Sequence, residues 1–122
     1  MTRDPGRAHD RALDIIDAIG NIRSDIGSMN KEQFLADGKT QRAVIESLIV
    51  IGEAANRIRQ LSPTIEEVLP TLWETLGDAY DMRIILTHEY FRVEPSIVWD
   101  TTENHMDSIF DLLTQFVSSD KN

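Results

Sequence analysis

The residues of this chain that are best suited to chemistry lie between Arg83 and Tyr90, in a largely apolar stretch that also holds His88. Arginine keeps its charge and presents a planar fork of donors to phosphate oxygens, which suits it to stabilising the negative charge of a phosphoryl transition state. Histidine can accept or release a proton near neutral pH. Together, Arg83 and His88 could drive attack of an RNA 2′-hydroxyl on its neighbouring phosphate without a metal ion.

Helix geometry separates these residues around the axis of the segment. At ~100° per residue, a helix brings Arg83, Thr87 and Tyr90 to one face. His88 then points ~140° away from Arg83. The two side chains converge only if the helix ends or distorts near Thr87, or if a second copy of the chain supplies the missing partner across a symmetric cleft. The second option predicts a homodimer as the active unit.

A carboxylate among small residues marks a second segment of interest. Glu53 lies between Gly52 and Ala54 on a segment with the apolar spacing of a core helix. A buried charge is unfavourable unless it is paired, so we expect Glu53 to have a cationic partner, with Arg83 as the first choice and a surface position as the alternative. The small residues also allow another helix to approach closely, within the bundle or between copies.

These segments together resemble a known family. The motif is an arginine, four residues, a histidine, one residue and a tyrosine, at residues 83–90, with Ile-Gly-Glu-Ala-Ala upstream at 51–55 and Val-Trp downstream at 98–99. In this order the chain resembles the HepT-like branch of the HEPN superfamily from about residue 10 to residue 116. One departure is Ile84, since that family commonly has a polar residue after the arginine.

The resemblance implies an all-α, homodimeric ribonuclease toxin, encoded beside a minimal MntA-like nucleotidyltransferase antitoxin that transfers AMP to the motif tyrosine. It implies Arg83 and His88 as catalytic residues and Tyr90 as the AMP acceptor, with RNA as substrate and no metal or cofactor held by this chain. The alternative is a non-catalytic helical partner or substrate of a nucleotidyltransferase, or a nucleotide-binding scaffold. Ile84 slightly favours that alternative.

Composition predicts a single cytoplasmic domain over residues 1–122. That length is enough to bury roughly two thirds of the surface of the unfolded chain. The absence of cysteine excludes disulfides and thiolate metal sites and fits a reducing compartment. We expect no membrane span and no secretory signal, because the sequence has no long apolar run and no basic-then-apolar leader.

The net charge of −9 argues against a protein that coats nucleic acid nonspecifically, since affinity for phosphate backbones comes mainly from Lys and Arg. A small basic cleft can still exist on an acidic body. The arginines that could line such a cleft are Arg57, Arg59, Arg83 and Arg92. We expect Thr87 or Glu89 to orient His88.

Apolar residues repeat at helical spacing along four segments, which predicts long helices at about residues 6–26, 40–61, 70–91 and 95–118. Asn30, with Gln33 three residues later, predicts a short helix over 30–36 that Gly38 breaks. His105 is expected to be a structural residue at the edge of the core. Four principal helices with short connections predict an all-α, up-and-down bundle.

Overall fold

The computed structural model describes residues 3–89 and 92–119. In chain order, the helices are α1 (Ala8–Ile26), α2 (Lys31–Leu35), α3 (Gly38–Leu61), α4 (Ile65–Val68), α5 (Pro70–His88) and α6 (Pro95–Ser119). No strand occurs in these two described ranges. The prediction of an all-α fold with four long helices is confirmed, and each predicted long helix is present within a few residues of its expected bounds.

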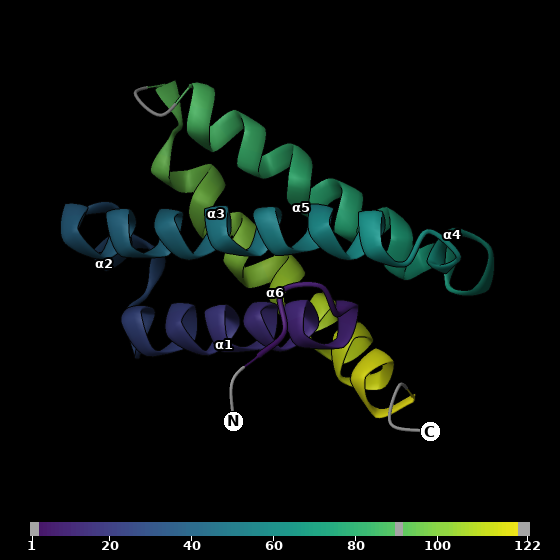
Figure 1. The fold of residues 1–122 in the computed structure, drawn as a ribbon. Helices are drawn as coiled ribbons and strands as arrows, with labels where there is room; N and C mark the ends of the chain where they lie inside the picture. Colours follow the sequence, from purple (N-terminus) through teal and green to yellow (C-terminus); the bar gives the residue numbers. More distant parts are fainter. Residues whose placement is uncertain (1–2, 90–91, 120–122) are drawn as a thin grey trace.

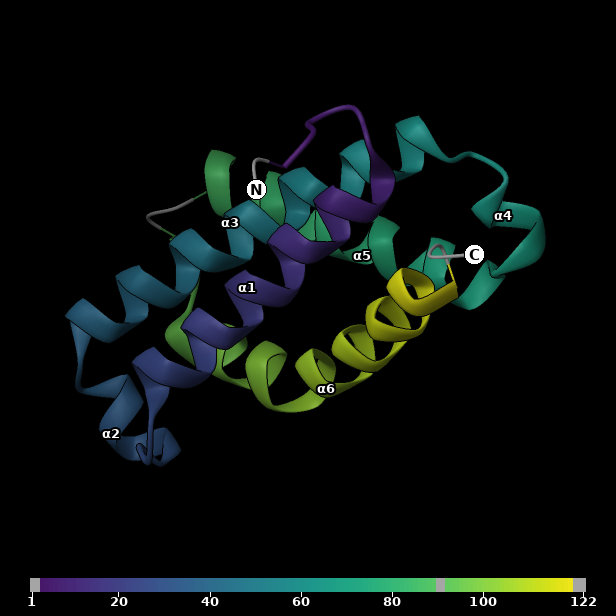
Figure 2. The same ribbon diagram turned by 60° about the horizontal axis from the view of Figure 1, so that its bottom comes forward.

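The central element of the bundle is α3, which lies between α1 and α5 (Figure 1). Successive long helices run in alternating directions (Figures 1 and 2), and in the view of Figure 1 α6 runs diagonally across α3 and α1. The short helix α2 joins α1 to α3 at one end, and α4 joins α3 to α5 at the other. Because α3 contacts both flanking helices, its side chains can contribute to surfaces on two sides of the molecule.

The apolar stripes of α1 and α3 form the inside of the bundle. Fully or almost fully buried side chains on these stripes are Ile15, Ile19, Ile22, Val44, Leu48, Ile51, Ala55 and Ile58. Burial of one large aliphatic side chain contributes roughly 1.5–3 kcal/mol relative to its exposed state. The spacing of three and four residues that predicted these helices therefore also predicts which of their faces is buried.

A side-chain cap sets the start of α3 earlier than the sequence pattern indicated. The Thr40 backbone N–H donates to Asp37 Oδ1 at 3.0 Å, so Asp37 is the N-cap and Gly38 is the first helical residue. The prediction that Gly38 breaks the short helix is therefore wrong, because α2 already ends at Leu35 and Gly38 belongs to α3. Asn30 and Gln33 do form the expected reciprocal capping box at the start of α2, with hydrogen bonds of 2.8 and 2.9 Å.

Helix α5 differs from the other long helices because its apolar side chains are spread around the axis. Leu76 and Leu86 are buried in the bundle, whereas Ile84 and Ile85 are 37% and 47% exposed. A helix that is apolar on more than one side is usually covered on more than one side. No helix in the described part of the chain has both the length and the apolar character needed to span a membrane.

Candidate active site

Arg83 lies at a close contact between α3 and α5. The first side-chain atoms of Arg83 face Gly52 of α3. A Cβ added at Gly52 would clash with Arg83 Cβ and lie 2.7 Å from the Ala79 carbonyl oxygen. Any side chain at residue 52 would therefore push the two helices apart. The small residues were expected to allow close helix contact within the bundle or between copies, and Gly52 makes such a contact within the bundle.

Glu53 is the ionic partner of Arg83. Arg83 Nε lies 2.7 Å from Glu53 Oε2, and the two side chains are 28% and 64% exposed. The Nε atom is buried and its N–H is not aligned with the carboxylate, so the contact is a close ion pair rather than a linear hydrogen bond. The predicted partner of Glu53 is thus confirmed, although Glu53 lies at the surface. The carboxylate fixes the side chain of Arg83 at the α3–α5 junction.

His88 is the last residue of α5 and is exposed. Its Nδ1 lies 3.0 Å from the Ile84 carbonyl oxygen and 3.3 Å from Thr87 Oγ1. A carbonyl oxygen can only accept, so this geometry assigns the proton to Nδ1 and leaves the lone pair of the neutral ring on Nε2. The imidazole is therefore oriented to accept a proton at Nε2.

Thr87 is a weaker contact of the His88 ring than the Ile84 carbonyl oxygen is. Its hydroxyl lies 2.9 Å from the Arg83 carbonyl oxygen, to which it donates, and this ties it to the helix backbone. The Ile84 carbonyl oxygen is the nearer partner of His88 Nδ1. Glu89 is the C-cap of α5, and no hydrogen bond or ion pair joins its side chain to His88 in the structure.

Arg83 and His88 lie on different faces of α5. Helix α5 continues through both residues, so they keep the ~140° separation of a regular helix. No hydrogen bond connects the two side chains in the part of the chain that the structure describes. Helix α5 ends at His88, one residue after Thr87, and this end does not join the two side chains by a hydrogen bond.

Arg57 and Arg92, the other arginines predicted around the site, make no hydrogen bond with Arg83 or His88 in the described structure. Arg57 is exposed on α3, where its Nη1 donates to Gln60 Oε1 at 3.2 Å. Arg92 is exposed beyond the end of α5, and its backbone N–H donates to the Glu89 carbonyl oxygen at 2.8 Å. Tyr90 lies outside the described residues.

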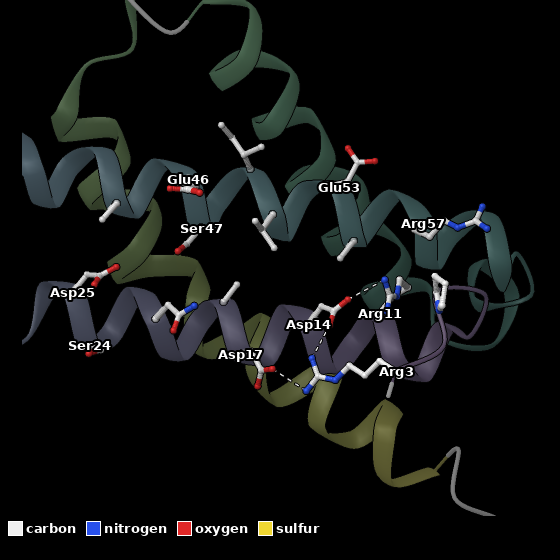
Figure 3. A pocket seen from close by; sticks show the side chains of 17 residues that line it. Arg3, Arg11, Asp14, Asp17, Ser24, Asp25, Glu46, Ser47, Glu53 and Arg57 are labelled. Atoms are coloured by element: carbon white, nitrogen blue, oxygen red, sulfur yellow. Dashed lines mark hydrogen bonds and ion pairs between the residues drawn. The ribbon is translucent and has the colours of Figure 1, made fainter. Parts of the chain in front are cut away.

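A groove of about 890 Å³ runs between α1 and α3. Figure 3 shows Arg3 bonded to both Asp14 and Asp17, at 2.6 and 2.8 Å, while Arg11 lies 3.0 Å from Asp14. Further carboxylates and Arg57 complete the lining, and carboxylates outnumber arginines there. Because Arg3 and Arg11 are paired with carboxylates, and carboxylates are in excess around Arg57, this groove is poorly suited to holding phosphate.

No group of three or more His, Asp or Glu that could hold a metal ion occurs among residues 3–89 and 92–119. His9 lies beside Asp10, with Nδ1 3.2 Å from Oδ1. The side chain of His105 is exposed and lines a cavity beside the core residues Leu48 and Ile109, while the neighbouring Met106 takes the buried position.

Comparison with known proteins supports the assignment made from the motif. The model of the family described as "Ribonuclease HepT-like" matches residues 15–116. The chain belongs to the HepT-like family. A comparison with solved structures finds no significant match.

Relatives of this HepT-like chain include a protein of Thermococcus cleftensis named "Probable ribonuclease HepT". It is 35% identical over 104 residues, which cover 84% of this chain and 90% of the relative. Two proteins of Methanocaldococcus jannaschii that are named as candidate RNases are also similar. One is 34% identical over 91 residues, covering 75% of this chain and 71% of the relative, and the other is 29% identical over 96 residues, covering 79% and 75%.

One contact beside the site of this HepT-like chain was not predicted from its sequence. Arg59 Cζ lies 4.0 Å from the centroid of the Trp73 ring, so α3 and α5 are also joined by a cation–π contact. Arg59 was expected only as one of several arginines in a basic cleft. Its aromatic partner is on a different helix, and local spacing does not reveal such a pair.

Proposed function

We propose that this chain is a metal-independent endoribonuclease toxin of a toxin–antitoxin pair. Two observations support the ribonuclease activity: the chain belongs to the HepT-like family, and relatives that cover most of its length are named as ribonucleases. The observation that carries the mechanism is the hydrogen bond between His88 Nδ1 and the Ile84 carbonyl oxygen, which leaves Nε2 free to act as a base.

The proposed reaction is an attack of an RNA 2′-oxygen on the adjacent phosphorus. His88 Nε2 takes the proton of the 2′-hydroxyl as the new P–O bond forms. Arg83, held by Glu53, donates to the non-bridging oxygens and stabilises the extra negative charge on the phosphorane. The bond to the 5′-oxygen breaks, and that oxygen takes a proton from solvent. The products are a 2′,3′-cyclic phosphate and a 5′-hydroxyl end.

The active unit in this proposal is a homodimer in which each site takes Arg83 from one copy and His88 from the other. The ~140° separation of the two residues on α5 supports this arrangement, because one regular helix cannot direct both at one phosphate. The exposed Ile84 and Ile85 support it as well, since they lie beside the motif and give a second copy apolar surface to cover. Arg57, Arg92 and Thr87 act as supporting residues around this cleft.

In the cell, we propose that a cognate MntA-like nucleotidyltransferase inactivates the toxin by transferring AMP from ATP to Tyr90. The support for this step is the family motif, in which a tyrosine follows the histidine by two residues. AMP on Tyr90 would add a phosphodiester charge and a bulky base near Arg83, and would repel or block the phosphates of RNA. Any Mg²⁺ needed for the transfer belongs to the partner enzyme.

The alternative function is a non-catalytic partner or substrate of a nucleotidyltransferase, or a nucleotide-binding scaffold. The observation that favours it is Ile84, an exposed apolar residue at a position that is commonly polar in the family. A scaffold of this kind would accept AMP on Tyr90 and leave RNA intact.

Purified protein incubated with RNA in the presence and absence of EDTA separates the two functions. The proposed mechanism requires cleavage that persists in EDTA and yields 2′,3′-cyclic phosphate ends. Arg83→Ala and His88→Ala should each reduce the rate by ~100-fold or more, the usual size of acid–base and electrostatic contributions. Cleavage that is lost in EDTA, or that survives both substitutions, would exclude this mechanism.

A further inference from the structure

Arg59 is held against α5 at a distance from the Arg83–His88 site. Its Cζ lies 4.0 Å from the centroid of the Trp73 ring. Gly77, one turn further along α5, makes room for the guanidinium, because a Cβ at that position would lie 2.8 Å from Arg59 Nη1 and 3.3 Å from Cζ. The ring and the glycine together fix the guanidinium between α3 and α5.

This stacked cation has no anionic partner in the described structure. Arg59 Nε is buried and makes no hydrogen bond, and no described carboxylate lies within ion-pair distance of the guanidinium. Arg23 provides a contrast, since it stacks on Phe110 at 4.8 Å but also pairs with Asp107 at 2.6 Å. A partly buried cation without an anion is unfavourable compared with a paired one. The surroundings of Arg59 therefore suit an anionic ligand.

The position of Arg59 relative to Arg83 indicates which anion this is. Gly52 marks the level of Arg83 on α3, and Arg59 follows it by two helical turns, ~10 Å along the axis. Tyr80 lies between the two levels on α5, with its ring centroid 6.0 Å from Arg83 Cζ. Trp73 and Tyr80 are two turns apart and so share one face of α5.

The α3–α5 face thus has two aromatic rings between two cations, in the order Arg59 on Trp73, Tyr80, Arg83. Surfaces that bind single-stranded nucleic acid combine positive charge along the backbone with aromatic side chains or guanidinium planes on which bases stack. The acidic groove between α1 and α3 offers no comparable surface.

We propose that Arg59 and Trp73 form a subsite that binds a backbone phosphate of single-stranded RNA, a short distance along the strand from the phosphate that is cleaved at Arg83. This subsite rests on the proposed ribonuclease function and names the contact that holds its substrate. The guanidinium, stacked on Trp73, donates N–H groups to the phosphate oxygens. No bond is made or broken at the subsite, so it acts on substrate binding and leaves the chemical step unchanged.

Substrate length tests this subsite directly, because a dinucleotide occupies the cleavage site alone, whereas an oligonucleotide of about eight residues reaches both sites. Arg59→Gln should raise KM for the longer substrate about tenfold, with kcat unchanged, and should leave the kinetics of the dinucleotide unchanged. Gly77→Ala keeps Arg59 but displaces its guanidinium, so it should raise the same KM. Arg23→Gln is the matched control, since it removes a stacked arginine from the α1–α6 side, and its KM should equal that of the wild type.

An unchanged KM for the longer RNA in both Arg59→Gln and Gly77→Ala would overturn the subsite while leaving the ribonuclease function intact. An equal loss on the dinucleotide would also overturn it, because Arg59 would then act on the cleavage site or the fold. If the wild type cleaves no RNA, the proposed function fails, and binding of the same oligonucleotide measured by fluorescence anisotropy decides the subsite. The subsite is supported if Arg59→Gln and Gly77→Ala both bind the oligonucleotide more weakly than the wild type and Arg23→Gln do. Equal binding by all four proteins overturns the subsite. If Arg59→Gln does not fold in a thermal unfolding check, Gly77→Ala and Arg59→Lys carry the same comparison.

Discussion

Glu53 Oε2 and Arg83 Nε lie 2.7 Å apart across the junction of α3 and α5. This ion pair joins the helix with the small-residue segment to the helix with the arginine–histidine motif. It links the two parts of the sequence that carry the resemblance to the HepT-like family.

Replacing Glu53 with Gln keeps the size of the side chain and removes its charge. Arg83 would then be less firmly positioned for the transition state, so kcat should fall roughly tenfold while KM changes little. Steady-state kinetics on RNA measures both constants. Glu53→Asp, which restores the carboxylate, should recover part of the rate. Glu46→Gln, an exposed position on the same helix, serves as the control, and an equal loss in that variant would contradict a specific role for Glu53.

Gly52→Ala tests the close approach of α3 and α5. The added methyl group would meet Arg83 Cβ and the Ala79 carbonyl oxygen, so we expect the free energy of unfolding to fall by ~1–3 kcal/mol, the usual effect of overpacking. Urea denaturation provides the measurement. Gly20→Ala is the opposite case, because nothing lies within 4 Å of a Cβ at that position of α1. That control should gain roughly 0.5–1 kcal/mol, and equal effects of the two substitutions would show that the α3–α5 contact is not tight.

The four long helices were predictable because their stabilisation comes from apolar residues with regular spacing, such as Ile15, Ile19 and Ile22 in α1. The separation of Arg83 and His88 was also predictable, since it depends only on the pitch of one helix. Contacts between helices were harder to predict. Glu53 was matched to Arg83 from charge alone, but the pairing of Arg59 with Trp73 depends on how α3 and α5 are aligned, which local spacing does not determine.

The Asp37 cap predicts a pH dependence of stability. The backbone N–H of Thr40, which donates to the carboxylate, holds the pKa of Asp37 below its ordinary value of 3.8. A lowered folded-state pKa means that the ionised group stabilises the native state above pH 3.8 and that this contribution is lost as pH falls through the folded-state pKa. Asp37→Ala should therefore lower Tm at pH 7, and the difference from wild type should shrink under acidic conditions. A difference that is constant from neutral to strongly acidic pH would contradict this account.

Tyr90→Phe tests the proposed control by AMP transfer. The variant should keep the fold and much of the toxicity, because the phenol takes no part in the proposed cleavage. It should escape inactivation by the cognate nucleotidyltransferase, because it lacks the acceptor oxygen. Intact mass spectrometry after co-expression should show one or more AMP units on the wild type and none on the variant. AMP found on Tyr80 instead, or silencing of Tyr90→Phe by the partner's enzymatic activity, would refute this assignment.

The claim that two chains build one site first requires a dimer of about 28 kDa, twice the 13.9 kDa chain, which sedimentation can measure. Ile85→Glu places a charge on the exposed apolar side of α5 and should give an inactive monomer. Val68→Glu, a similar change at an exposed position of α4, should leave the dimer intact. These two variants separate a specific interface from a general effect of added charge.

The most direct measurement is RNA cleavage by a mixture of Arg83→Ala and His88→Ala subunits, unfolded and refolded together. If each site takes Arg83 from one copy and His88 from the other, a mixed dimer contains one intact site and one site that lacks both groups. Random pairing then predicts that the mixture recovers roughly a quarter of wild-type activity, although each variant alone is inactive. A mixture that stays as inactive as its components, while dimers of both kinds of subunit are present, would contradict the shared site.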